Sequence, residues 1–77
     1  MLVTPINSYH FIVEHRGISY LQSYNKLVAV CDRKVVYVNE TALKHIRSHV
    51  KEFVDRQETR EVVGLPEHMF DKKVREL

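Results

Sequence analysis

Two histidines four residues apart are the feature of this sequence best suited to chemistry. His45 and His49 fall within a predicted helix, where this spacing can bring two imidazoles to one metal ion. The zinc-protease pattern also needs a glutamate directly after the first histidine, as general base, and this chain has Ile46 there. A zinc site needs three or four protein ligands. The other possible ligands are His10, His15, His68 and Cys31, and the sequence does not place any of them next to the histidine pair. We therefore predict neither metal nor cofactor, and interpret His45 as solvated and His49 as a boundary residue.

The remaining nucleophiles do not complete a catalytic arrangement. Cys31 ends a predicted core strand, where a free cysteine behaves as a small buried hydrophobe, whereas reactive thiols need an exposed, electropositive setting. The chain has no glycine-rich phosphate loop and no serine in the context of a nucleophile elbow. We predict no catalytic residues. A small hydrolase that uses His45 or His49 as general base is the least favoured hypothesis.

Basic residues suggest a second class of function. Lys44, Arg47 and Lys51 follow one side of the predicted helix, and Arg33 and Lys34 lie in a predicted turn. Such cations can contact a nucleic-acid backbone while neighbouring tyrosines stack on bases. The formal net charge is only +2, and acidic residues are mixed into the same helix. Nucleic-acid binding is therefore the alternative hypothesis and not the favoured one.

Polar and aromatic residues alternate in the segment before residue 25. Tyr20, Gln22 and Tyr24 are predicted to share one side of an extended strand. Tyrosines on a sheet face are frequent in protein interfaces, and equally frequent as structural residues that pack on a helix. We name these three residues as candidate protein-binding residues and leave both interpretations open.

The elements that must position these residues begin with four strands between about residues 10 and 38. Gly17 is predicted to turn the first hairpin. The runs 26–31 and 35–38 are apolar at successive positions, which is typical of strands covered on both faces. The second cover could be a helix or another subunit.

Two helices are predicted to follow. Asn39 is suited to cap a helix over about 40–57, and the polar segment after it is interpreted as a break, with a short extended piece at 61–63. Pro66 suits the first position of a second helix over about 66–76. Strands grouped before helices favour an α+β fold, a four-stranded mainly antiparallel sheet followed by two helices, as a single domain over 1–77. The predicted core is Phe11, Val13, Leu27, Val28, Ala29, Val30, Val36, Val38, Leu43, Ile46, Val50, Phe53, Met69 and Phe70.

Composition places the chain in a cellular setting. A lone cysteine indicates a reducing compartment, and no basic stretch followed by an apolar run precedes the strands. No apolar run approaches the ~20 residues that span a bilayer. We expect a cytoplasmic protein with no membrane partner. Because 77 residues support only a modest core, a homodimer is one way to add stability.

One stretch resembles a family of small uncharacterised proteins of bacteriophages and other mobile elements. The resemblance covers about residues 22–53 and rests on Ser23-Tyr24-Asn25-Lys26-Leu27-Val28-Ala29-Val30-Cys31-Asp32, on Val36-Tyr37-Val38-Asn39, and on Ser48-His49 with Phe53. Lys26 replaces a small polar residue of the family pattern, and His45-Ile46-Arg47 replaces a Thr/Ser-rich run. The resemblance implies a phage accessory protein that acts by binding a host protein, and it carries no catalytic role. The favoured function is accordingly a small non-enzymatic protein-binding module.

Overall fold

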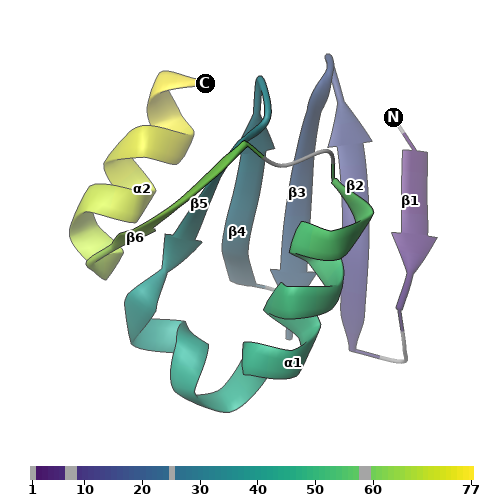
Figure 1. The fold of residues 1–77 in the computed structure, drawn as a ribbon, viewed down its shortest axis with the longest axis horizontal. Coiled ribbons are helices and arrows are strands. Elements are labelled where there is room, and N and C mark those ends of the chain that lie inside the picture. The colour runs from purple at the N-terminus through teal and green to yellow at the C-terminus, as the bar shows by residue number, and fades with distance from the viewer. Residues whose placement is uncertain (1, 7–8, 25, 58–59) are drawn as a thin grey trace.

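The computed structural model describes residues 2–6, 9–24, 26–57 and 60–77, and for residues 43–46 it describes the backbone alone. These residues form an α+β structure built on a six-stranded mixed sheet, in which the strands lie side by side in chain order (Figure 1). The elements are β1 Leu2–Pro5, β2 His10–His15, β3 Ile18–Ser23, β4 Lys26–Asp32, β5 Val35–Asn39, α1 Glu40–Arg56, β6 Glu61–Leu65 and α2 Glu67–Glu76. The α+β class is confirmed, but the sheet is larger than the four strands predicted.

The first five strands form an antiparallel meander joined by short turns. Arg16 and Gly17 connect β2 to β3, and Arg33 and Lys34 connect β4 to β5. All four residues have positive φ, between 51° and 78°. Two-residue turns with positive φ at both positions match the twist of the flanking strands, so they set the register of both hairpins. Gly17 takes its predicted role.

The chain crosses from β5 through α1 to β6, which pairs with β5 in parallel. A parallel neighbour needs a connection of a dozen or more residues, and α1 supplies it. Asn39 caps α1 as predicted, because its side-chain oxygen accepts a hydrogen bond from the Thr41 backbone N–H at 3.0 Å. Pro66 lies one residue before α2, at its N-cap, and not at its first helical position.

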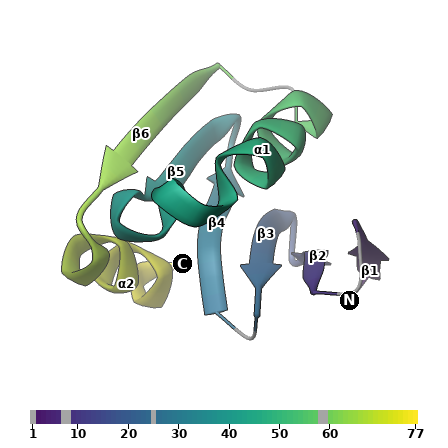
Figure 2. The ribbon, with the colours of Figure 1, turned by 90° about the horizontal axis from the view of Figure 1, so that it is seen from below.

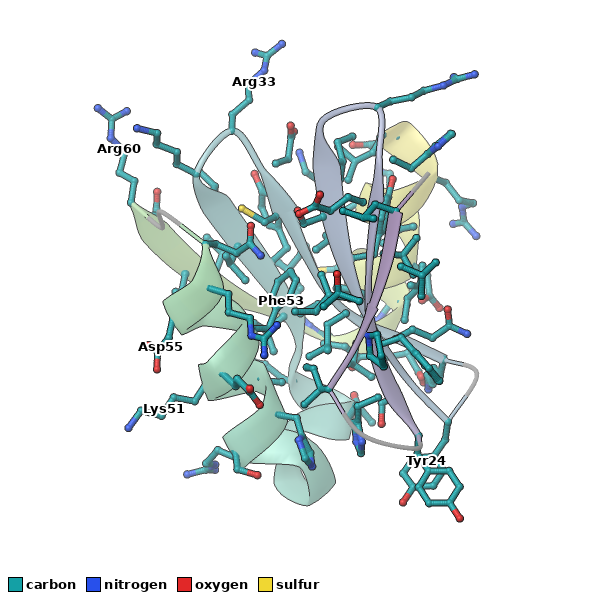
Figure 3. All side chains as sticks on the ribbon, turned by 90° about the vertical axis from the view of Figure 1, so that its right-hand side faces the viewer. Tyr24, Arg33, Lys51, Phe53, Asp55 and Arg60 are labelled. Carbon is teal, nitrogen blue, oxygen red and sulfur yellow. The ribbon has the colours of Figure 1, made fainter. Side chains whose placement is uncertain are left out.

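The main core lies between α1 and one face of the sheet. Ile12, Leu21, Ala29 and Val38 are opposite one another in four successive strands and are all buried. Figure 3 shows Phe53 of α1 pointing into this layer, where the side chain is fully buried. The whole cluster is Ile12, Leu21, Val28, Ala29, Cys31, Val36, Val38, Val50 and Phe53.

The second helix covers part of the opposite face. Val30 alternates with the α1-facing residues of β4, yet it is also fully buried, as is Phe70 of α2. Lys73 of α2 lies over the ring of Tyr37, a β5 residue on this same face. Figure 2 shows α1 and α2 on opposite sides of the sheet. Residues 28–31 of β4 are all buried, as expected for a strand covered on both faces. For β5 the two covers are α1 and α2.

For some residues of the predicted core, the prediction of burial is wrong. In β2 the residues that face α1 are His10 and Ile12, while Phe11 and Val13 are half-buried on the other face. Phe11, Ile12 and Val13 are all apolar, so the sequence does not show which face of the strand is buried. The polar His10 favoured the face of Phe11 and Val13 as the buried one. Leu27 is likewise only half-buried. Met69 is 48% exposed, beside the buried Phe70. The side chains of Leu43 and Ile46 lie outside the described residues.

Two strands were not predicted as strands. β1 is short and contains Pro5, so its pattern is that of an irregular segment. β6 has only Val62 and Val63 as β-branched residues, and a polar segment precedes it. The extended piece predicted at 61–63 is part of β6, but its parallel pairing with β5 depends on a crossover that local pattern does not encode.

Candidate functional site

A shallow apolar groove lies on the part of the sheet that α2 does not cover. It has a volume of about 230 Å³ and is lined by Val13, His15, Tyr20, Gln22 and Leu27. These residues alternate with α1-facing neighbours such as Ile12 and Leu21, so the groove opens on the face opposite α1. Two of the three predicted protein-binding residues, Tyr20 and Gln22, are therefore together in one hollow.

A row of paired residues leads from the groove to the edge of the sheet. Val3, Val13 and Tyr20 are opposite one another in β1, β2 and β3, and Val30 continues the row in β4. Val30 is fully buried, Val13 and Tyr20 are half-buried and Val3 is 51% exposed, so burial falls from β4 to β1. Figure 2 shows α2 near β5 and β6, with no described helix over this side of β1–β3. We call Val3, Val13, Tyr20, Gln22 and Leu27 the open face.

Tyr24 does not belong to the open face. β3 ends at Ser23, and Tyr24 has a φ of 49°, which breaks the alternation of the strand. Its ring stacks on Tyr9 with centroids 4.9 Å apart, and the residue is 65% exposed. Figure 3 shows it projecting from one end of the molecule. The prediction that Tyr24 shares a side with Tyr20 and Gln22 is wrong, because the strand ends one residue too early.

Two histidines stack between β2 and α1. The rings of His10 and His49 are 3.8 Å apart between centroids, and Tyr24 meets His10 edge-on at 5.4 Å. Burial lowers the pKa of His10, and the nearby His49 lowers it further. His10 thus favours its neutral form, which suits a stacked pair. His49 is half-buried, as expected of a residue at the boundary of the apolar stripe of its helix. Its stacking partner His10 was not predicted from the sequence.

The described residues contain no group of three or more His, Cys, Asp or Glu side chains that could hold a metal ion. The side chain of His45 lies outside the described residues. Cys31 is buried against the α1 side, and this burial raises the pKa of its thiol, so the thiolate is disfavoured. Its predicted character as a small buried hydrophobe is confirmed.

The predicted basic residues fall into separate groups. Arg33 and Lys34 form the β4–β5 turn, and the Lys34 carbonyl accepts a hydrogen bond from the backbone N–H of Arg60 at 2.6 Å. Figure 3 shows Arg33 and Arg60 projecting at one end of the sheet, while Lys51 projects from the middle of α1. Arg47 is also exposed on α1. The side chain of Lys44 lies outside the described residues.

An acidic residue separates these groups. Asp55 lies on α1 between Lys51 and the end that carries Arg60, as Figure 3 shows. Arg56 donates to Glu52 at 3.0 Å, in an i,i+4 pair on the same helix. The predicted cations whose side chains are described, Arg33, Lys34, Arg47 and Lys51, therefore do not form one uninterrupted surface.

Neither α1 nor α2 is long and apolar enough to cross a membrane, within the part of the chain that the structure describes. Comparisons with protein-family models, with curated proteins and with solved structures found no match to this chain.

Proposed function

We propose that this chain is a small non-enzymatic protein-binding module that docks on another protein through the open face. The observation that carries the proposal is the groove around Tyr20, which lies on the part of the sheet that neither described helix covers. Small domains have little apolar surface to spare, so an uncovered apolar row such as Val3–Val13–Tyr20 favours a partner.

The residue types of the open face suit a protein interface. Tyr20 offers a large apolar ring with a hydroxyl that can reach a polar group, and Gln22 beside it can donate and accept hydrogen bonds. Val13 and Leu27 supply the apolar floor. A central aromatic residue within an apolar hollow is the usual form of an interface hot spot. The resemblance to small bacteriophage proteins favours a bacterial host protein as the partner.

Site-specific photo-cross-linking tests this proposal. With p-benzoylphenylalanine in place of Gln22, the chain should give one dominant covalent adduct in bacterial lysate, and excess unmodified chain should suppress it. The substitution Tyr20→Asp in the same chain should abolish the adduct while the circular dichroism spectrum stays unchanged. The matched control carries the same photo-reactive residue in place of Arg47, which is exposed on α1.

The pattern of adducts decides the outcome. Equal labelling from positions 22 and 47, or no adduct from position 22, would exclude the open face as a docking surface. An adduct of about twice the 9.1 kDa of the chain would identify the partner as a second copy and the module as a homodimer.

Nucleic-acid binding is the weaker proposal, because Arg33 and Lys51 project from separate places with Asp55 between them. This second proposal predicts that the affinity for DNA or RNA falls steeply as the salt concentration rises. It also predicts that binding is lost when the charges of Arg33, Lys34 and Lys51 are reversed.

A further inference from the structure

β6 is an edge of the sheet with little protection. Among the described strands it pairs only with β5, so the backbone N–H and C=O groups of alternate residues point away from that neighbour. Val62 is 52% exposed on this strand, and no proline or lysine interrupts its five residues. The opposite edge, β1, is shorter and contains Pro5, which blocks strand addition. Of the two edges, β6 is the one able to accept another strand.

A groove lies beside this edge, between the sheet and α2. It has a volume of about 440 Å³, and its lining residues are Tyr37, Leu65, His68, Met69, Lys72, Lys73 and Glu76. Leu65 belongs to β6 itself, so the groove and the edge strand are contiguous. Figure 1 shows β6 as the outermost strand with α2 next to it.

The groove combines an apolar floor with a basic rim. Tyr37, Leu65 and the 48% exposed Met69 provide the apolar surface. Two lysines, Lys72 and Lys73, and one carboxylate, Glu76, are among the lining residues. Lys73 is held over the Tyr37 ring, with Nζ 4.7 Å from the centroid, so one cation is fixed at the wall of the groove. This charge balance favours an acidic ligand.

We propose that an extended acidic segment of a partner protein adds to β6 as a further strand and places side chains in the groove between β6 and α2. Backbone hydrogen bonds to the outer edge of β6 supply affinity without sequence preference. Every second side chain of the added strand faces α2. A segment that fits has an apolar residue over Met69 and acidic residues two positions away, where they meet Lys72 and Lys73. This site is separate from the open face and does not depend on it.

The proposal is tested with a fluorescent peptide in which a central leucine has two acidic residues on each side. Titration into the full ¹⁵N-labelled chain should shift the backbone amide signals of β6 and α2, and leave those of β1–β3 in place. Affinity should fall as the salt concentration is raised from about 20 to about 300 mM, because the rim charges are exposed. Lys72→Glu should weaken binding by about fivefold, whereas the control Lys51→Glu on α1 should change it by less than about twofold.

Two further peptides separate the parts of the proposal. Methylation of the backbone nitrogens at alternate positions removes strand hydrogen bonds and keeps every side chain, so this peptide should bind at least about tenfold more weakly. A peptide with lysines in place of the acidic residues should not bind. Equal affinity of either peptide, shifts outside β6 and α2, or no binding at about 2 mM acidic peptide would each overturn the proposal.

Discussion

The stacked pair of His10 and His49 makes the stability of the fold depend on pH. His10 is 4% exposed and its pKa is lowered, first by burial and then by His49. The unfolded chain therefore takes up a proton near the ordinary histidine pKa of about 6.5, while the folded chain resists it. The stability contributed by neutral His10 is present above that value. It is lost as the pH falls from about 6.5 through the lower pKa of the folded state.

Urea unfolding between about pH 5 and pH 8 measures this dependence. The midpoint should fall as the pH drops below about 6.5. His10→Phe keeps an aromatic ring between His49 and Tyr24 and should flatten the profile. The control His15→Phe, at the exposed end of the same strand, should leave the profile unchanged. An unchanged profile in His10→Phe would show that His10 is not the group responsible.

Asn39 is a fully buried residue that starts α1. Its side-chain oxygen accepts from the Thr41 N–H at 3.0 Å, and that N–H has no partner within the helix. Asn39→Ala should lower the free energy of unfolding by about 1–2 kcal/mol, at the upper end for a helix cap because the site is buried. Thr41→Ala, at an exposed position in the first turn, should cost less than about 0.5 kcal/mol. Chemical denaturation compares the two, and equal costs would contradict the capping role.

At the scale of elements, α2 is attached to the sheet mainly through one side chain. Phe70 is 1% exposed, whereas its neighbour Met69 is 48% exposed. Phe70→Ala should cost about 3 kcal/mol or more, a large share of the stability of so small a chain. Phe70→Leu should cost about 1 kcal/mol and keep the chain folded for measurement. Met69→Ala should cost less than about 1 kcal/mol, although the sequence placed both residues in the core.

An ion pair also ties the start of α2 to the sheet. Lys26 at the start of β4 donates to Glu67 in the first turn of the helix. The hydrogen bond and the charge of Lys26 lower the pKa of Glu67. Both side chains are exposed by more than a third, so solvent screens the pair and Phe70 remains the main anchor.

The elements that the sequence predicted correctly are those defined by local signals. α1 has a capping Asn39 and an apolar stripe that includes Val50 and Phe53, and the hairpin turn at Gly17 needs positive φ. β6 could not be predicted as an ordered strand, because it pairs with a strand that is distant in the sequence. In the pair Val35–Glu61, for example, the two residues are 26 positions apart. Short β-branched segments gain their structure from such distant pairing.

The candidate sites follow the same division. Tyr20 and Gln22 were placed correctly because alternation along one strand is a local property. Tyr24 was not, since nothing local marks the end of β3 at Ser23. The groove beside β6 was beyond prediction, because it needs Tyr37, Leu65 and α2 together and the pairing of β6 was unknown.

The whole molecule has a firmly packed side and a loosely packed side. α1 covers one face of β4 and β5, and α2 lies over β5 and β6 on the other face. Val28, Ala29, Val30 and Cys31 are buried in succession. β1 lies at the far edge, where β2 is its only neighbour among the described strands, and it exposes both Leu2 and Val3 by more than half. Stability is therefore expected to be uneven across the sheet.

Deletions from the two ends test this unevenness. A chain in which Ile6 directly follows the initiating methionine loses β1 but keeps Ile6, which packs against the core. It should fold cooperatively with a loss of about 1–2 kcal/mol, because little apolar surface is uncovered. A chain that ends at Leu65 loses α2 and with it the buried Phe70 and the cover over β5, so it should show no cooperative thermal transition or should self-associate. Circular dichroism follows the thermal unfolding of both chains. A cooperative transition of similar midpoint in both would contradict the expectation. It would mean that α2 stabilises the sheet no more than an exposed edge strand does.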